Sequence, residues 1–156
     1  MFEVNHEADE ALRGLNERYF HGVDERDLDA VGACFALDAT CVYLGGGWRL
    51  SGRRAIIERL SIINTWLSTV HSPATMSFTA GQDGADGVIY AVAHLMTADH
   101  DGSRRITVRG LKYSDRYARA GGEWLIAERR QEALWQYEVP AITAALPGQR
   151  GEDAPG

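Results

Sequence analysis

The fold is decided by a strand-like run in the second half of the chain, residues 87–98, which reads GVIYAVAHLMTA. A strand has a side-chain period of two, so alternate residues share a face. The two faces carry Ile89, Ala91, Ala93 and Leu95, and Tyr90, Val92, His94 and Met96. Both faces are mostly apolar, whereas a strand with one solvated face alternates apolar with polar residues. We therefore expect one face to cover a helix and line a cavity, and the other to pack against a second subunit.

Three more strand-like runs surround this one. They are residues 68–80, 104–118 and 123–137, and short segments rich in Gly and Asp separate them. Four long strands in succession, joined by short turns, predict an antiparallel meander.

The first part of the chain has the spacing of helices. Apolar residues recur every three or four positions from Ala8 to Tyr19, which predicts an amphipathic helix that ends near Gly22. Asp27 can then cap a short second helix, and Asp24 lies at the joint of the resulting hairpin. The apolar stripe of the second helix consists of Leu28, Val31, Cys34 and Phe35.

Between the hairpin and the long strands, residues 40–44 and 48–50 predict two short strands around a tight turn at 45–47. Ser51 can cap a third helix that extends to about Trp66. Helices followed by a long sheet predict a single α+β domain over residues 1–140, in which the sheet wraps around a helix. Residues 147–156 have no apolar periodicity, so we expect a disordered tail there.

Composition and charge exclude several classes of function. The net charge of −6 argues against a nucleic-acid partner, since phosphate binding needs a basic surface. No apolar run is long enough to span a membrane and the acidic N-terminus does not resemble a signal peptide, so we expect a cytoplasmic protein without a membrane partner. Cys34 and Cys41 lack a metal-binding spacing and are expected to be buried thiols. The turn at 99–102 has no further ligands nearby in sequence, so we expect neither a metal nor a cofactor.

Five motifs carry a resemblance to a known family. They are YFHGVDERD at residues 19–27, FALDAT at 35–40, STVH at 68–71, GLKYSDRY at 110–117 and WLIAERR at 124–130. In their order and spacing, the chain resembles the SnoaL-like branch of the NTF2-like superfamily over roughly residues 8–138. The members of that superfamily are cone-shaped α+β barrels. The resemblance implies a cone-shaped, curved antiparallel sheet wrapped around the N-terminal helical hairpin and a third helix.

Within the superfamily, the chain is similar to the enzymes with an Asp–His dyad, which include scytalone dehydratase, the bile-acid 7α-dehydratases and γ-hexachlorocyclohexane dehydrochlorinase. There the Asp ends the first helix and the His opens a strand, and Asp24 and His71 occupy these two positions. Tyr43 corresponds to the catalytic tyrosine of the dehydratases. Tyr19 and Arg129 correspond to further pocket residues, so the resemblance implies that both bind substrate.

Two other residues complete the expected substrate-binding set. His94 matches a second pocket histidine on a comparable strand of scytalone dehydratase, and Trp135 lies on the last predicted strand. The remaining histidines, His6, His21 and His100, are expected to face solvent.

The dyad suits proton abstraction. Histidine titrates near neutrality, so an oriented, neutral His71 could remove a proton at physiological pH. A carboxylate at Asp24 would fix the tautomer and stabilise the imidazolium that forms. Tyr43 could donate to a carbonyl oxygen or a leaving hydroxyl, and Arg129 could bind a carboxylate, an enolate or a leaving group. The implied reaction is proton removal next to an activating group, followed by β-elimination or double-bond migration.

The residues themselves leave structural interpretations open. Asp24 can cap the second helix or pair with an arginine, His71 can be a strand-end histidine, and the tyrosines can be core aromatics. Arg129 and Arg130 point to opposite sides of a strand, so only one of them faces inward. Thr75 stands where the dehydrochlorinase has an Asn, which argues against halide elimination.

We therefore expect a cofactor-independent, dehydratase-like lyase that acts on a hydrophobic cyclic small molecule. Two alternatives remain: an isomerase or polyketide-type cyclase with the same dyad, and a non-catalytic small-molecule-binding protein. The second apolar face of residues 87–98 predicts a homo-oligomer. The resemblance favours a trimer over a dimer, because the Asp–His dehydratases are trimers.

Overall fold

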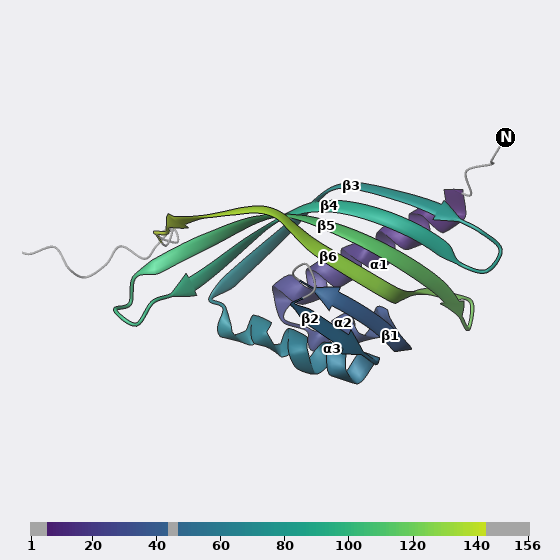
Figure 1. Ribbon diagram of the computed structural model, residues 1–156, viewed down its shortest axis with the longest axis horizontal. Coiled ribbons are helices and arrows are strands. Elements are labelled where there is room, and N and C mark those ends of the chain that lie inside the picture. Colours follow the sequence, from purple (N-terminus) through teal and green to yellow (C-terminus); the bar gives the residue numbers. More distant parts are fainter. Residues whose placement is uncertain (1–5, 44–46, 143–156) are drawn as a thin grey trace, which may run out of the picture.

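Figure 1 shows the computed structural model, which describes residues 6–43 and 47–142. The helices are α1 (His6–Glu25), α2 (Leu28–Ala33), α3 (Arg53–Leu60) and the short 3₁₀ helix η2 (Ser61–Thr65). The strands are β1 (Phe35–Tyr43), β2 (Trp48–Ser51), β3 (Ser68–Ala80), β4 (Ala85–Ala98), β5 (Arg104–Ala120) and β6 (Glu123–Pro140). The predicted order, helices first and long strands after them, is confirmed.

The strands form one sheet in the order β2-β1-β6-β5-β4-β3. Strands β3 to β6 make the predicted antiparallel meander. β1 pairs antiparallel with β2 but parallel with β6, so the sheet is mixed rather than wholly antiparallel. The parallel pairing begins where α2 ends, because the Cys34 carbonyl accepts a hydrogen bond from the Ile126 N–H at 2.8 Å.

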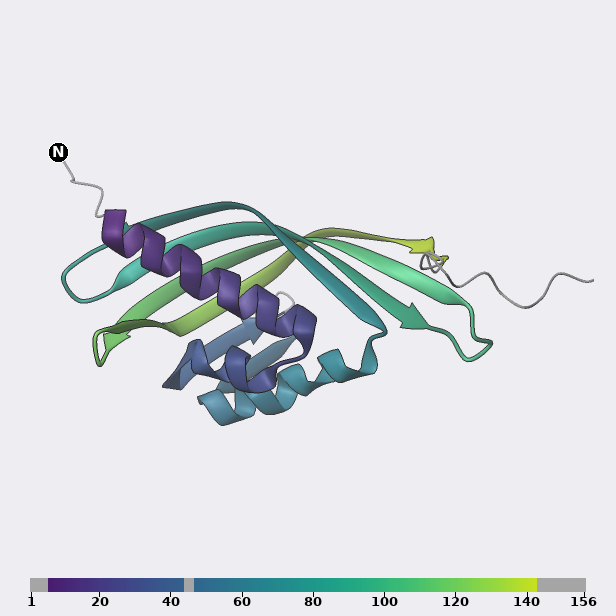
Figure 2. The same cartoon turned by 180° about the vertical axis from the view of Figure 1, so that it is seen from behind.

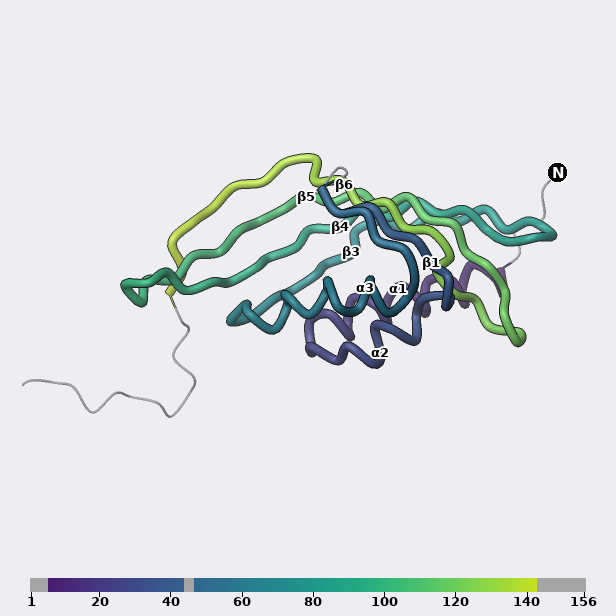
Figure 3. Tube along the Cα trace, turned by 60° about the horizontal axis from the view of Figure 1, so that its bottom comes forward, coloured from purple at the N-terminus to yellow at the C-terminus, as the bar shows by residue number. Residues whose placement is uncertain are grey.

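The sheet is curved, and the helices lie on its concave side. Figure 2 shows α1 crossing in front of the long strands, and Figure 3 shows the sheet arching over the helices. The predicted stripe of α1 is buried beneath this arch: Ala8, Leu12, Leu15 and Tyr19 are each exposed by 3% or less. This is the α+β arrangement of a curved sheet around a helix that the sequence predicts.

The two faces of β4 differ as the strand period predicts. Its inner residues, Ile89, Ala91, Ala93 and Leu95, are at most 4% exposed. Tyr90, on the outer face, is 42% exposed. The inner face therefore contributes to the core, and the outer face remains open in the single chain.

Two boundaries of the helical hairpin differ from the prediction, and the predicted third helix is divided into α3 and η2 at Leu60. α1 continues to Glu25 instead of ending near Gly22, and Gly22 is a buried residue within the helix. A Cβ at Gly22 would lie 2.9 Å from Val31 Cγ2, so the absence of a side chain lets α1 and α2 approach closely. Phe35 begins β1 rather than ending the second helix, because it pairs with Ile126 of β6.

The helix caps agree with the prediction in one of two cases. Asp27 caps α2, and its side chain accepts from the Ala30 N–H at 2.9 Å. Ser51 does not cap α3, because it still belongs to β2; Gly52 precedes the helix with a φ of 89° and no side-chain cap.

No helix in the described part of the chain is long and apolar enough to cross a membrane. The predictions for residues 44–46 and for the tail at 147–156 fall outside the described residues.

Candidate active site

The C-terminal end of α1 positions Asp24. Arg26 adopts a left-handed φ of 60°, and its N–H and that of the next residue donate to the carbonyls of Val23 (3.2 Å) and Gly22 (2.8 Å). These two bonds form the Schellman motif that ends many helices. The Arg26 guanidinium donates to the Trp66 carbonyl at 2.7 Å, just before β3 begins. The end of α1 is thereby tied to the start of β3.

Asp24 and His71 meet at this junction. Asp24 Oδ1 lies 2.7 Å from His71 Nδ1, and Asp24 Oδ2 accepts from the His71 backbone N–H at 2.8 Å. Thr69 Oγ1 donates to Oδ1 at 2.9 Å. Phe20 stacks on the imidazole, with the ring centroids 5.8 Å apart. Because Asp27 supplies the cap of α2, the Asp24 carboxylate is available to orient His71.

The surroundings of Asp24 favour its ionised form. Burial raises the pKa of this carboxyl, but the hydrogen bonds from the His71 side chain and backbone and from Thr69 outweigh burial and lower the pKa below its usual 3.8. A carboxylate can only accept hydrogen bonds, so a neutral imidazole carries its proton on Nδ1. His71 Nε2 is thereby left as the unprotonated ring nitrogen.

A cavity lies between the helices and the inner face of the sheet, and His71 is part of its wall. Most of the lining is apolar or aromatic, including Trp48 and Trp66. The polar side chains of the lining are Tyr19, Tyr43, His71, Arg109, Tyr113 and Gln131. An apolar pocket with a few convergent polar groups is typical of a small-molecule site.

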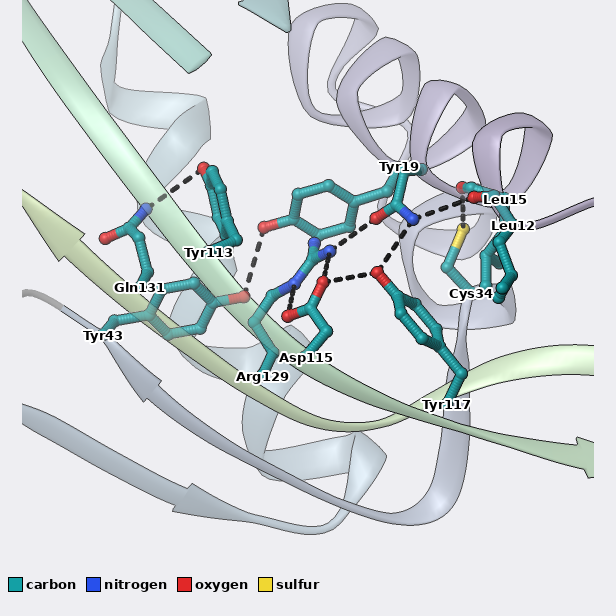
Figure 4. A network of polar contacts seen from close by, with 11 residues as sticks. Leu12, Leu15, Tyr19, Cys34, Tyr43, Tyr113, Asp115, Tyr117, Arg129 and Gln131 are labelled. Carbon is teal, nitrogen blue, oxygen red and sulfur yellow. Dashed lines mark hydrogen bonds and ion pairs between the residues drawn. The ribbon is translucent and has the colours of Figure 1, made fainter. Parts of the chain in front are cut away.

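Tyr19 from α1 and Tyr43 from β1 meet at the cavity wall. Their hydroxyl oxygens are 3.1 Å apart, and Figure 4 shows the two hydroxyls directed at each other. Burial raises the pKa of Tyr19, and it raises the pKa of Tyr43 well above its usual value, to which the neighbouring Tyr19 adds. Both phenols therefore remain protonated at neutral pH and can donate hydrogen bonds.

Arg129 lies behind the tyrosines and outside the cavity lining. It faces inward, whereas Arg130 is exposed. Its guanidinium donates to both carboxylate oxygens of Asp115, at 2.9 and 2.6 Å, and to Asn16 Oδ1 at 2.6 Å. Its Cζ atom lies 4.3 Å from the centre of the Tyr19 ring (Figure 4). The Nε and Nη2 atoms of Arg129 are therefore engaged in this buried network, whereas its Nη1 is buried and has no hydrogen-bond partner among the described residues. Direct binding of substrate by Arg129 stays a prediction.

The other two expected substrate-binding residues lie on the outer face of the sheet. His94 is exposed, because it stands between the inward-facing Ala93 and Leu95. Trp135 is 49% exposed, and its indole covers Gly110, where an added Cβ would clash with it. A bulge in β6 turns Trp135 outward. The prediction that these two residues contact a ligand in the cavity is therefore wrong.

Five polar or aromatic residues of the lining were missed from the sequence: Trp48, Trp66, Arg109, Tyr113 and Gln131. Tyr113 and Gln131 are cross-strand partners on the inner face, and the Gln131 amide donates to the Tyr113 hydroxyl at 3.2 Å. The alternation of faces along β5 and β6 could have identified them, but only if the register between the strands had been known. Within residues 6–43 and 47–142, no group of three His, Cys, Asp or Glu side chains could hold a metal ion.

A family model described as a SnoaL-like domain matches residues 5–130 of the chain. No curated protein matches the sequence.

Three solved structures illustrate the similarity of fold. A putative scytalone dehydratase from Novosphingobium aromaticivorans is 19% identical, with a TM-score of 0.79 over 95% of this chain and 97% of that one. The hexachlorocyclohexane dehydrochlorinase LinA-type3 from Novosphingobium barchaimii is 15% identical, with a TM-score of 0.73, and the match covers 90% of this chain and 95% of that one. A putative aromatic ring hydroxylase from N. aromaticivorans is 21% identical, with a TM-score of 0.75, and the match covers 89% of this chain and 96% of that one. Identities this low show a shared fold alone.

Proposed function

The chain belongs to the SnoaL-like domain family, and from this premise we propose that it is a cofactor-independent lyase of the dehydratase type. The observation that carries the proposal is the 2.7 Å contact between Asp24 and His71 at the wall of an apolar cavity. In this proposal His71 is the base and Asp24 orients it. Tyr43 stabilises developing charge, and Tyr19 contacts the substrate.

The reaction begins at Nε2 of His71. This nitrogen takes the proton from the carbon next to a carbonyl group, and the electrons of the broken C–H bond form an enolate. The enolate collapses to a C=C bond as the bond to the β-hydroxyl breaks. The departing hydroxide takes the proton from the imidazolium, so the products are the unsaturated compound and water.

Tyr19 and Tyr43 are suited to stabilise the substrate oxygen on which negative charge develops. A protonated phenol at the wall of an apolar cavity stabilises an enolate oxygen more in the transition state than in the ground state. The raised pKa values of Tyr19 and Tyr43 support this role, because they keep both groups protonated. One hydroxyl donates to the other, and the second is left to donate to the ligand. The names of two similar structures, a putative dehydratase and a dehydrochlorinase, support an elimination.

Proton abstraction can be tested without the natural substrate. Wild-type protein in D₂O is expected to exchange the α-protons of 1-tetralone, a cyclic ketone, for deuterium, which ¹H NMR detects as loss of the α-proton signal. His71→Asn is expected to slow this exchange by about 100-fold or more, the usual contribution of a general base. His94→Asn, on the outer face, is the matched control and should exchange at the wild-type rate.

A panel of cyclic β-hydroxyketones then separates the alternatives by product mass. A product lighter by one water supports the lyase. A product of unchanged mass with a moved double bond or a new ring supports the isomerase or cyclase. Wild-type protein that binds such ketones without exchanging their α-protons contradicts both enzymes and supports a non-catalytic binding protein.

We also propose that the chain forms a homo-oligomer, with a trimer favoured by the family resemblance, through the outer face of the sheet. Tyr90, Trp135, Tyr137 and Val139 are between 38% and 54% exposed. Trp135 and Tyr137 stack on each other, with ring centroids 6.1 Å apart. Apolar patches of this kind mark interaction sites. A second copy of the chain presents the same apolar surface, so the two patches can pack against each other.

A further inference from the structure

Arg109 is a cavity residue that the proposed elimination does not use. Among the side chains that line the cavity it alone carries a permanent charge. It is partly buried on the inner face of β5, and its Nε donates to Gln136 Oε1 on β6 at 3.0 Å. Glu138, two residues further along β6, is held by Arg105 at 3.4 Å and by Thr107 at 3.2 Å. Within residues 6–43 and 47–142, Arg109 therefore has no carboxylate partner.

The register of the sheet places Arg109 opposite the base. His71 of β3 pairs with Ala93 of β4, Ala93 pairs with Arg109 of β5, and Arg109 pairs with Gln136 of β6. These strands lie side by side (Figure 1), so the His71 and Arg109 backbones are about 10 Å apart, two strand spacings. The residue between them carries only a methyl group. A ligand can therefore lie over Ala93, between the imidazole and the guanidinium.

The chemistry of Arg109 selects the group that would face it. With Nε held by Gln136, the two terminal nitrogens remain as a fork that matches the two oxygens of a carboxylate. A partly buried cation without a counter-ion loses part of its hydration energy, and the interaction with an anionic ligand compensates for that loss. The neighbouring polar groups, Tyr113 and Gln131, can donate but carry no negative charge to compete.

We infer that Arg109, positioned by Gln136, binds the carboxylate of the ligand, whose apolar ring then lies over Ala93 against His71. The ligand class is a hydrophobic cyclic or aryl carboxylic acid. The inference rests on the proposed function only for the identity of the cavity as the reaction site, because acid binding itself needs no turnover.

A matched pair of probes tests the charge preference. Isothermal titration calorimetry would compare cinnamate with cinnamamide, which has nearly the same shape and no charge. Wild-type protein is expected to bind cinnamate about tenfold or more tightly than the amide, as one charge-assisted contact provides. Arg109→Gln should lose this preference through weaker binding of the acid, with the affinity for the amide unchanged. Arg109→Lys, which keeps the charge but loses the fork, should retain part of it.

Arg130→Gln is the control for charge removal, because Arg130 is exposed and pairs with Glu132 at 3.8 Å. It should keep the wild-type preference. Equal affinities in wild type, no binding of either probe, or a preference that survives Arg109→Gln would overturn the inference. The α-proton exchange assay distinguishes failure of this inference from failure of the proposed function. If the protein exchanges α-protons but does not prefer the acid, only the role of Arg109 is wrong. If it prefers the acid but does not exchange α-protons, it is a binding protein for organic acids.

Discussion

At the scale of the residue, one carboxylate organises the candidate site. Asp24 accepts from the His71 ring and backbone and from Thr69, so it fixes the tautomer, the ring plane and the local course of β3 together. The same contacts give Asp24 a stabilising role. A carboxylate that is hydrogen-bonded in the folded state, and hydrated in the unfolded state, makes stability depend on pH.

Asp24→Asn is expected to lower the free energy of unfolding by about 1 to 3 kcal/mol at pH 7, because the charge-assisted hydrogen bonds are weakened. The pKa of Asp24 is lowered in the folded protein, so its contribution is fully present above the usual pKa of 3.8 and is lost as the pH falls through the lower folded value. The difference between wild type and variant should therefore shrink below pH 3.8. Urea unfolding at a series of pH values measures it.

Asp27→Asn is the control for this measurement. It removes one negative charge from the same turn but keeps a side-chain acceptor at the cap of α2. A difference between wild type and Asp24→Asn that stays constant from pH 7 to pH 3 would contradict the assigned role of the carboxylate charge.

At the scale of the element, β6 decides which residues reach the interior. Arg129 faces inward and Trp135 outward, although an even number of positions separates them. The register against β5 shifts between Gly110 and Leu111, so Leu134 is an additional residue in β6. Such a bulge reverses the face of every residue that follows. It moves Trp135 out of the cavity and brings Gln136 beside Arg109.

β5 and β6 also hold the buried ion pair of Asp115 and Arg129. The two residues are directly opposite in the register, and both side chains are fully buried. Burial lowers the pKa of Arg129, but the adjacent Asp115 carboxylate outweighs burial and raises the pKa well above its usual value. The guanidinium therefore stays charged, and Tyr117 completes the network by donating to Asp115 at 2.6 Å.

Arg129→Met is expected to destabilise the fold by about 3 to 5 kcal/mol, because it leaves the Asp115 carboxylate buried without its cation. The double variant Arg129→Met/Asp115→Leu should recover part of this loss, since it removes both charges. Chemical denaturation of the two single variants and the double variant gives the coupling energy. If the loss of unfolding free energy in the double variant equals the sum of the losses in the two single variants, the two residues are not a coupled buried pair.

At the scale of the whole molecule, the curved sheet separates two surfaces of different character. Its concave face holds α1 (Figure 1) and, between the helices and the sheet, the cavity. Its convex face exposes the apolar side chains of Tyr90, Trp135, Tyr137 and Val139. In a single chain this patch would remain in contact with water, at a cost proportional to its apolar area. Association between copies of the chain removes that cost.

Sedimentation velocity tests this association. Wild-type protein is expected to sediment as an oligomer of about three chains, and Tyr90→Lys should shift it towards the monomer, because the new cation lies beside Lys112, the cross-strand partner of Tyr90. Leu37→Lys is the control, since Leu37 is 77% exposed on β1. A monomeric wild type, or an oligomer that Tyr90→Lys leaves intact, would contradict an interface on the outer face.

The sequence by itself determined the features that depend on local periodicity and on motif position. Side-chain spacing within one element predicted the stripe of α1 and the two faces of β4. The residue type at Asp27 predicted the helix cap, and the succession of long strands joined by short turns predicted the meander of β3 to β6. The positions of Asp24 and His71 followed from the family resemblance. The two residues are 47 positions apart in the chain, so their spacing alone does not predict that they are in contact.

Only the tertiary structure decided which polar residues share the cavity. The bulge in β6 reversed the expected face of Trp135, and the partner of Arg129 proved to be Asp115 on the adjacent strand. Arg109 joined the site through a register that spans four strands. The physical reason is that a side-chain period specifies a face only relative to its own strand, while register, bulges and ion-pair partners are set by hydrogen bonding and burial between distant segments.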